Sequence, residues 1–213
     1  MLVAVTAQAW QSQEGIIRIN GGRMTVALHP DPRPIEQSPA DPASLVTIYS
    51  DLGTGSSVYL PNIGWSVAGP DTGEQVATAT PFIPKRNFHL VLVKVAILAV
   101  SGTNGVTLSL NRDNNGQPGT AIKTWNLVNL PLFPGCCKLD RAKLSKTVKV
   151  KKGVQYWLVA GTSKTTRDSS DSWNMNSLSI FGTVGQRSNN GPWQITKGSA
   201  LLPAFSVLGA PAD

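Results

Sequence analysis

Several features are scarce in this sequence, and each scarcity excludes a class of protein. The 213 residues contain only two histidines and two cysteines, and no His-Glu-x-x-His pattern is present, so a zinc site of that type is excluded. No apolar run reaches the roughly 18 residues of a membrane-spanning helix. Residues 1–9 end in an Ala-x-Ala pattern but lack a basic start and a long apolar core, so we do not interpret them as a secretory signal.

Charged side chains are also scarce, at 15% of the chain, against a typical quarter or so. The surface must therefore be rich in Ser, Thr, Asn and Gln, a composition typical of secreted and surface β-proteins. The net charge is nevertheless +7, which indicates either an anionic partner or simple solubility. Seven cations lie within fifteen residues: Lys138, Arg141, Lys143, Lys146, Lys149, Lys151 and Lys152.

Part of this basic run alternates with valines, as on the polar face of a strand. No aromatic side chain lies between the lysines, so the stacking surface expected of a protein that binds single-stranded nucleic acid is missing. We therefore expect no nucleic-acid partner.

The two cysteines, Cys136 and Cys137, are adjacent, so they cannot close the long loop of an ordinary disulfide. We expect two reduced or buried thiols. The alternative is a vicinal disulfide, whose ring could form an apolar platform under a ligand but requires unusual backbone geometry. A metal site would need further ligands, and no His or other Cys is near in the sequence.

Residues 1–44 differ from the rest of the chain. Two short β-like pieces, residues 15–20 and 24–28, are joined by Asn20-Gly21, a strong hairpin signal. The segment "HPDPRPIEQSPADP" follows, with five prolines in fourteen residues, and predicts an extended linker. We place a boundary near Ala43, between an N-terminal arm of residues 1–44 and a domain of residues 45–213.

From residue 45 onward, short segments rich in Val, Ile, Thr, Tyr and Trp are separated by Gly, Asn, Asp and Pro. Residues 106–110 alternate apolar with polar side chains, as a half-buried strand does. This pattern predicts an all-β protein with a single β-sandwich of jelly-roll or Greek-key type. The segment 88–100 is long for one strand and is expected to span the core or turn a corner. The only predicted helix is a turn or two at residues 138–143.

The stretch "NRDNNGQPG" places Asn111, Asp113 and Asn115 at alternate positions before Gly116. These residues match positions one, three, five and six of a calcium loop, but position twelve is Ile122 where a bidentate Glu is required. Asx side chains also cap tight turns, and Gly supplies positive φ. We therefore favour a polar turn, keep Ca²⁺ as the alternative and expect no other cofactor.

Six tryptophans are many for this length. Trp173 and Trp193 lie in polar segments, "RDSSDSWNMN" and "RSNNGPWQ", and are the best candidates for exposure. An exposed indole stacks on the C–H face of a sugar while neighbouring amides, here Asn174 and Asn176, take hydrogen bonds. The alternative is a place in the core of the sandwich.

A catalytic site is not indicated by any spacing. There is no Gly-x-Ser-x-Gly pattern, the three glutamates fall in the arm or in turns, and no pair of Asp residues stands out as the two carboxylates of a glycosidase. A non-enzymatic protein is expected, with a glycan hydrolase as the less favoured alternative.

Read in order, "PFIPKRNFHLVLVKVAI", "VTLSLNRDNNGQPGTAI", "VKKGVQYWLVA", "DSSDSWNMN" and "PAFSVLG" resemble the uncharacterised bacterial secreted β-sandwich modules called choice-of-anchor R. The resemblance covers roughly residues 45–209. It includes a D-x-x-G-x-P-G turn at residues 113–119 and a Gly-x-x-Tyr-Trp-Leu strand at residues 153–158. It implies an extracellular or envelope-associated sandwich and carries no activity or ligand with it.

We therefore expect an extracellular or cell-surface β-sandwich that binds glycan or an anionic envelope polymer through exposed aromatics. The alternative is a structural subunit of a surface filament or particle coat. In that case residues 1–44 would pack on a neighbouring subunit by strand addition.

Overall fold

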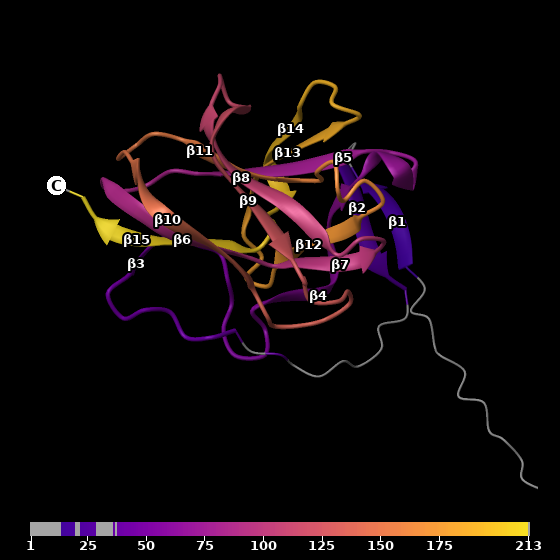
Figure 1. Ribbon diagram of the computed structural model, residues 1–213, viewed down its shortest axis with the longest axis horizontal. Helices are drawn as coiled ribbons and strands as arrows, with labels where there is room; N and C mark the ends of the chain where they lie inside the picture. Colours follow the sequence, from indigo (N-terminus) through magenta and orange to yellow (C-terminus); the bar gives the residue numbers. More distant parts are fainter. Residues whose placement is uncertain (1–13, 20–21, 29–35, 37, 213) are drawn as a thin grey trace, which may run out of the picture.

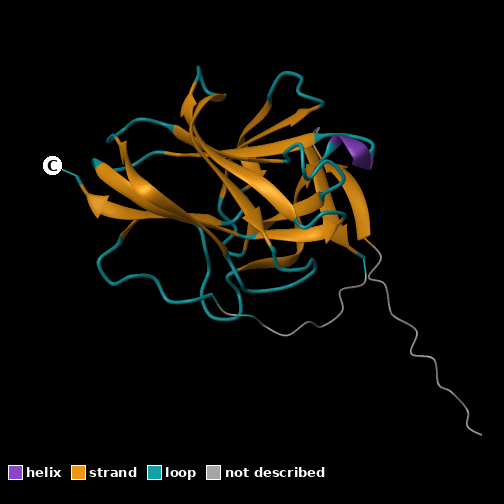
Figure 2. Ribbon diagram, viewed as in Figure 1, coloured by secondary structure: helices purple, strands orange, loops and turns teal. Residues whose placement is uncertain are grey.

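The computed structural model describes residues 14–19, 22–28, 36 and 38–212. It is a β-sandwich of two sheets, built from antiparallel pairs of strands and packed face to face (Figures 1 and 2). The prediction of an all-β sandwich is confirmed. Apart from a single 3-10 turn, Pro70–Thr72, the described residues form no helix, and none of them could cross a bilayer as a long apolar helix.

The large sheet has a central path in the order β1-β2-β4-β5-β11-β8-β9, to which β7, β12, β13 and β14 are attached. Its strands are β1 (Glu14–Ile19), β2 (Gly22–Ala27), β4 (Tyr59–Ala68), β5 (Val76–Phe82), β7 (Ile97–Ser101), β8 (Gly105–Asp113), β9 (Pro118–Val128), β11 (Tyr156–Gly161), β12 (Ser170–Asn176), β13 (Phe181–Ser188) and β14 (Gln194–Leu201). The small sheet has the order β10-β6-β15-β3, formed by β10 (Asp140–Val150), β6 (Phe88–Val95), β15 (Phe205–Pro211) and β3 (Val46–Ser50).

The core lies between the two sheets and follows from the alternation of side chains along each strand. On β8, Leu108 and Leu110 are fully buried, whereas Thr107 and Ser109 lie on the opposite face of the sheet. The same periodicity explains why the predicted helix at residues 138–143 is wrong. Ala142 is buried and Lys143 is exposed, as in a strand, and β10 pairs with β6 along this stretch.

Of the two courses expected for the segment 88–100, spanning the core or turning a corner, the structure shows the second. It breaks at Ala96, so that β6 belongs to the small sheet and β7 to the large one. The backbone of Ala96 is held by two hydrogen bonds, because its N–H donates to the carbonyl of Ala204 and its carbonyl accepts from Asn174.

The described part of the N-terminal region is paired with the rest of the chain. The β1–β2 hairpin extends the large sheet through β2, in which Met24 lies opposite Trp65 of β4. The segment before β3 also contacts the small sheet, since Asp41 forms ion pairs with Lys94 at 2.7 Å and with Arg141 at 3.0 Å.

Candidate functional site

Trp173 is not exposed, and the prediction that it binds a ligand through an accessible ring is wrong. The side chain is fully buried, lies edge-on to Phe205, and donates its indole N–H to the carbonyl of Ala204 at 3.1 Å. The reason is the face of β12 on which the side chain lies. Trp173 belongs to the core cluster between the sheets, where it meets Phe205 of β15 in the small sheet.

The two asparagines that follow Trp173 are also buried rather than available to a ligand. Asn174 donates its side-chain amide to the carbonyl of Leu60 at 2.8 Å. Asn176 donates to the carbonyls of Ile180 and Leu202, each at 2.9 Å. Buried polar groups need such partners, so the polar residues of this segment stabilise the fold.

Trp193 is the predicted aromatic that remains partly exposed. The guanidinium of Arg187 lies over its ring, with the carbon 4.8 Å from the ring centroid. Four other tryptophans among the described residues donate their indole N–H to a protein oxygen, namely Trp65, Trp125, Trp157 and Trp173. Trp193 has no such bond in the described part of the chain, and a ligand can therefore use its N–H.

A polar hollow of about 160 Å³ lies next to Arg187 on the outer face of the large sheet, the face opposite the core. It follows from the size of the side chains in one row across four strands. Arg187 of β13 lies opposite Ala77 of β5, and Gly161 of β11 lies opposite Thr107 of β8. Because Ala77 and Gly161 are small, the surface is depressed in the middle of this row. The lining consists of Gln75, Val76, Ala77, Thr107, Ser109, Val159, Gly161, Thr162, Arg187 and Asn190.

The hydroxyls on one side of this hollow are oriented by their own hydrogen bonds. Thr107 donates to the side-chain oxygen of Asn126 at 3.4 Å, and Ser109 donates to that of Asn111 at 2.7 Å. A hydroxyl whose proton is engaged keeps lone pairs as acceptors. This side can therefore accept hydrogen bonds from the hydroxyls of a ligand.

The opposite side of the hollow is positioned by hydrogen bonds between two loops. The N–H of Gln75 donates to the side chain of Asn189 at 3.1 Å, and the N–H of Asn189 donates to the carbonyl of Gln75 at 2.9 Å. Asn190 donates its amide to the side-chain oxygen of Gln75 at 2.9 Å. The amide nitrogen of Gln75 has no acceptor among the described residues and can donate to a ligand.

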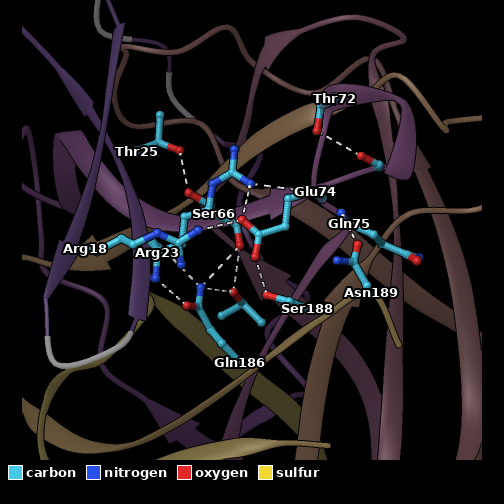
Figure 3. Close-up of polar contacts among 12 residues, drawn as sticks. Arg18, Arg23, Thr25, Ser66, Thr72, Glu74, Gln75, Gln186, Ser188 and Asn189 are labelled. Atoms are coloured by element: carbon cyan, nitrogen blue, oxygen red, sulfur yellow. Dashed lines mark hydrogen bonds and ion pairs between the residues drawn. The ribbon is translucent and has the colours of Figure 1, made fainter. Parts of the chain in front are cut away.

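A polar network next to Gln75 braces this side (Figure 3). The Glu74 carboxylate accepts from Arg18 at 2.6 Å, from Arg23 at 3.3 Å and from Ser188 at 2.6 Å. The bond from Ser188, followed by the two arginines, lowers the pKa of Glu74 although burial opposes the ionised form. These contacts join β1 and β2 to β13, so they hold in place the loop that carries Gln75.

Gln186 continues the network below the surface. Its side-chain oxygen accepts from the Arg23 backbone at 2.6 Å, and its nitrogen donates to the Arg23 carbonyl and to Thr78, each at 2.9 Å. Sequence reasoning did not identify this network or the hollow, because their members come from β1, β2, β5, β8, β11, β13 and the loops next to them. The only sequence pattern that marks the hollow is the alternation of small and polar residues in those strands, and many strands in other proteins share that pattern.

The "NRDNNGQPG" stretch forms the turn of the β8–β9 hairpin, as favoured from the sequence, with Asp113 opposite Pro118. One oxygen of the Asp113 carboxylate accepts from Trp157 and Gln155, each at 2.7 Å, and the other accepts from the N–H of Gly116 at 3.1 Å. Burial opposes ionisation, but these three bonds prevail and lower the pKa of Asp113. The carboxylate is thus engaged by the turn.

The other two predicted metal ligands also serve the turn. Asn111 donates its amide to the carbonyl of Gly119 at 2.7 Å, and Asn115 adopts a positive φ of 54° next to Gly116 at 80°. In the described part of the chain, no group of three or more His, Cys, Asp or Glu side chains could hold a metal ion.

Cys136 and Cys137 form a vicinal disulfide, so the expectation of two thiols is wrong and the alternative is the one observed. The pair lies in a loop before β10 and is bracketed by Glu36, whose N–H donates to the carbonyl of Cys136 and whose carbonyl accepts from Cys137, each at 2.9 Å. Cys136 borders a second hollow of about 200 Å³, together with Tyr59, Leu132 and others.

The basic run does not line the polar hollow. Lys143, Lys146 and Lys149 are exposed on β10, at the edge of the small sheet, whereas the hollow lies on the large sheet. Of the remaining cations, Lys138 forms an ion pair with Glu36 at 3.1 Å. The alternation seen in the sequence therefore reflects the polar face of a strand.

No family model matches this chain, and no curated protein matches it. The resemblance to choice-of-anchor R modules stays a prediction. The function must therefore be argued from the geometry of the hollow itself.

Proposed function

We propose that this protein is a non-enzymatic, extracellular or cell-surface β-sandwich that binds a glycan in the polar hollow beside Trp193. The observation that supports this proposal is the composition of the hollow. The hollow has hydroxyls on one side and amides and a guanidinium on the other, and a partly exposed indole lies next to it. These are the groups that bind a sugar. Sugar hydroxyls both donate and accept hydrogen bonds, so they can bond the hydroxyls, amides and guanidinium of the lining and the indole N–H of Trp193, which has no acceptor among the described residues.

The floor of the hollow fits this role because small and apolar residues form it. Ala77 and Gly161 offer little side chain, and a sugar ring resting on them reaches Thr107 on one side and Arg187 on the other. No Asp or Glu is among the described lining residues, whereas a glycosidase acts through two facing carboxylates. The lining therefore favours binding over hydrolysis.

A glycan array with the full chain and three variants tests the proposal. Trp193→Ala removes the indole, and Gly161→Val fills the floor with a side chain suited to a strand. Both should abolish binding. The control is Trp125→Phe, because Trp125 lies on the other face of the sheet, opposite Leu108, and bonds Lys143. Binding that is indifferent to Trp193→Ala and Gly161→Val, or no binding of any glycan, would remove the proposal.

The second candidate function is a structural subunit of a surface assembly, and the position of β1 favours it. β1 is the end strand of the central path of the large sheet, and Ile16 and Ile17 are 49% and 37% exposed. An apolar edge strand is a template for pairing with another chain. Size-exclusion chromatography over a range of concentrations should show larger species that Ile16→Lys disperses. A single monomeric peak at every concentration would exclude this function.

A further inference from the structure

We infer that the polar hollow selects acidic sugars, and that Arg187 binds their carboxylate. This inference rests on the proposed function and names its ligand class. The feature that the hollow would recognise is an anionic group on the sugar. We assign a carboxylate rather than a sulfate, because a planar carboxylate matches the planar fork of a guanidinium and accepts two parallel hydrogen bonds.

Among the described arginines, Arg86, Arg112 and Arg187 form no ion pair with an Asp or Glu, and of these three only Arg187 lines the hollow. Arg18 and Arg23 pair with Glu74, Arg141 pairs with Asp41, and Arg167 pairs with Asp71. Among the described residues, the guanidinium of Arg187 stacks on the ring of Trp193 and forms no hydrogen bond. Its donors are therefore not engaged by the protein, although the side chain is partly buried at the wall of the hollow.

Two polar atoms of residues that line the hollow also lack partners among the described residues. The Nε of Arg187 and the Oγ1 of Thr162 are covered by protein and form no hydrogen bond within the described part of the chain. Such unsatisfied groups cost free energy and are rare in native proteins. Both residues line the same hollow. An anionic ligand seated there offers acceptor oxygens to donors of this kind.

The electrostatics of the hollow favour a negative charge. Its described lining contains one cation, Arg187, and no Asp or Glu, and the chain as a whole carries +7. The stacking of Arg187 on Trp193 holds the guanidinium in place before a ligand arrives, which reduces the entropy lost on binding. A sugar bound with its carboxylate at Arg187 would place its hydroxyls toward Thr107 and Ser109, across the floor.

Matched ligands test this assignment. Calorimetry would measure the binding of three ligands to the full chain: trigalacturonate, its methyl ester and a sulfated galactose trisaccharide. A glycan array would add further pairs, each made of a uronate or sialate and its neutral counterpart. The acid should bind at least about tenfold more tightly than its neutral counterpart. Arg187→Gln should remove that preference, and Arg187→Lys should restore only part of it, because a lysine keeps the charge but loses the fork. Thermal melting of each variant checks the fold.

The outcomes separate this inference from the proposed function. Binding of neutral and acidic sugars with equal affinity, lost in Trp193→Ala, would overturn the acid selectivity and leave glycan binding intact. A preference for the sulfated sugar would overturn the assignment of a carboxylate. An acid preference that persists in Arg187→Gln would overturn the role of Arg187. Absence of binding to any sugar would overturn both proposals together.

Discussion

Trp157 donates its indole N–H to the carboxylate of Asp113 across 2.7 Å. The indole is fully buried, whereas the carboxylate belongs to the hairpin turn between β8 and β9. The bond therefore fastens a surface turn to the centre of the large sheet. Trp157 also packs beneath Trp193 and Ile195 in one apolar cluster, so the same indole supports the turn and the aromatic beside the hollow.

Asp113→Ala should lower the free energy of unfolding by about 2 to 3 kcal/mol, because it leaves the buried indole N–H without an acceptor. Urea unfolding would measure the loss, and Asn115→Gly in the same turn is the control, since Gly tolerates the positive φ of that position. An Asp113→Ala variant as stable as the control would contradict this role.

The pH dependence of the same bond has a definite sign. The pKa of Asp113 is lowered in the folded state, so its contribution to stability is present above the pKa of the unfolded chain and is lost as the pH falls through the folded pKa. The difference between the wild type and Asp113→Ala should therefore shrink under acidic conditions, below about pH 4.

Three buried carboxyls should produce the opposite dependence at higher pH. Burial raises the pKa of Asp51 to about 7 and those of Asp140 and Asp171 to about 8, and the charge of Asp171 adds to the shift of Asp140. A carboxyl with a raised folded pKa penalises folding once the unfolded chain ionises. Stability should thus fall as the pH rises from about 4 to about 8 and then level off.

Asp171→Asn tests this dependence most directly. Asp171 is fully buried, accepts a hydrogen bond from Ser169, and has one carboxyl oxygen without a partner in the described structure. The variant should show a flatter decline of melting temperature between pH 5 and pH 8. Asp168→Asn, at an exposed site three residues earlier, is the control and should leave the slope unchanged. An unchanged slope in Asp171→Asn would refute the assignment.

The Glu74 network should stabilise the chain by more than an exposed ion pair does. Glu74→Gln weakens contacts to Arg23 and Ser188, and the Arg23 side chain is only 13% exposed. We expect a loss of about 1 kcal/mol, against close to zero for Arg167→Gln, because the Arg167–Asp71 pair is about half exposed on both sides. Equal losses in the two variants, measured by urea unfolding, would mean that the network adds nothing beyond a surface pair.

The fold could be predicted from the sequence to the extent that it depends on local alternation. Residues 106–110 alternate clearly, and the structure places Leu108 and Leu110 in the core. The long segment 88–100 was too long for one strand, and it turns between the sheets at Ala96. The "NRDNNGQPG" turn is encoded locally as well, because its Asx and Gly residues satisfy backbone groups close in the sequence.

The site could not be predicted in the same way, because its residues meet only through the topology. Trp173 has polar neighbours, which suggests exposure, yet Asn174 and Asn176 bond carbonyls of Leu60 and Leu202 far along the chain. The hollow depends on which small residues of β5 and β11 lie side by side. Such pairings are set by sheet order, and no local pattern encodes them.

Gly185 provides a final prediction, on how Trp193 is positioned. A Cβ at this position of β13 would lie 2.9 Å from Ile195 and 3.3 Å from the ring of Trp193. Gly185→Ala should therefore push the β14 hairpin outward, cost about 1 to 3 kcal/mol of stability and shift the tryptophan fluorescence. Glycan binding should weaken at the same time, because Trp193 and Arg187 move away from the hollow.

Gly161→Ala is the matched control for this change. It adds the same methyl group on a neighbouring part of the sheet, where the Cβ would meet Ala77 at an ordinary 3.6 Å. We expect little loss of stability and no shift in fluorescence. If Gly185→Ala behaves like Gly161→Ala in both measurements, the contact of β13 with Trp193 does not fix the indole. The position of Trp193 would then depend on its packing with Trp157 and its stacking with Arg187, and Arg187→Gln should produce the fluorescence shift instead.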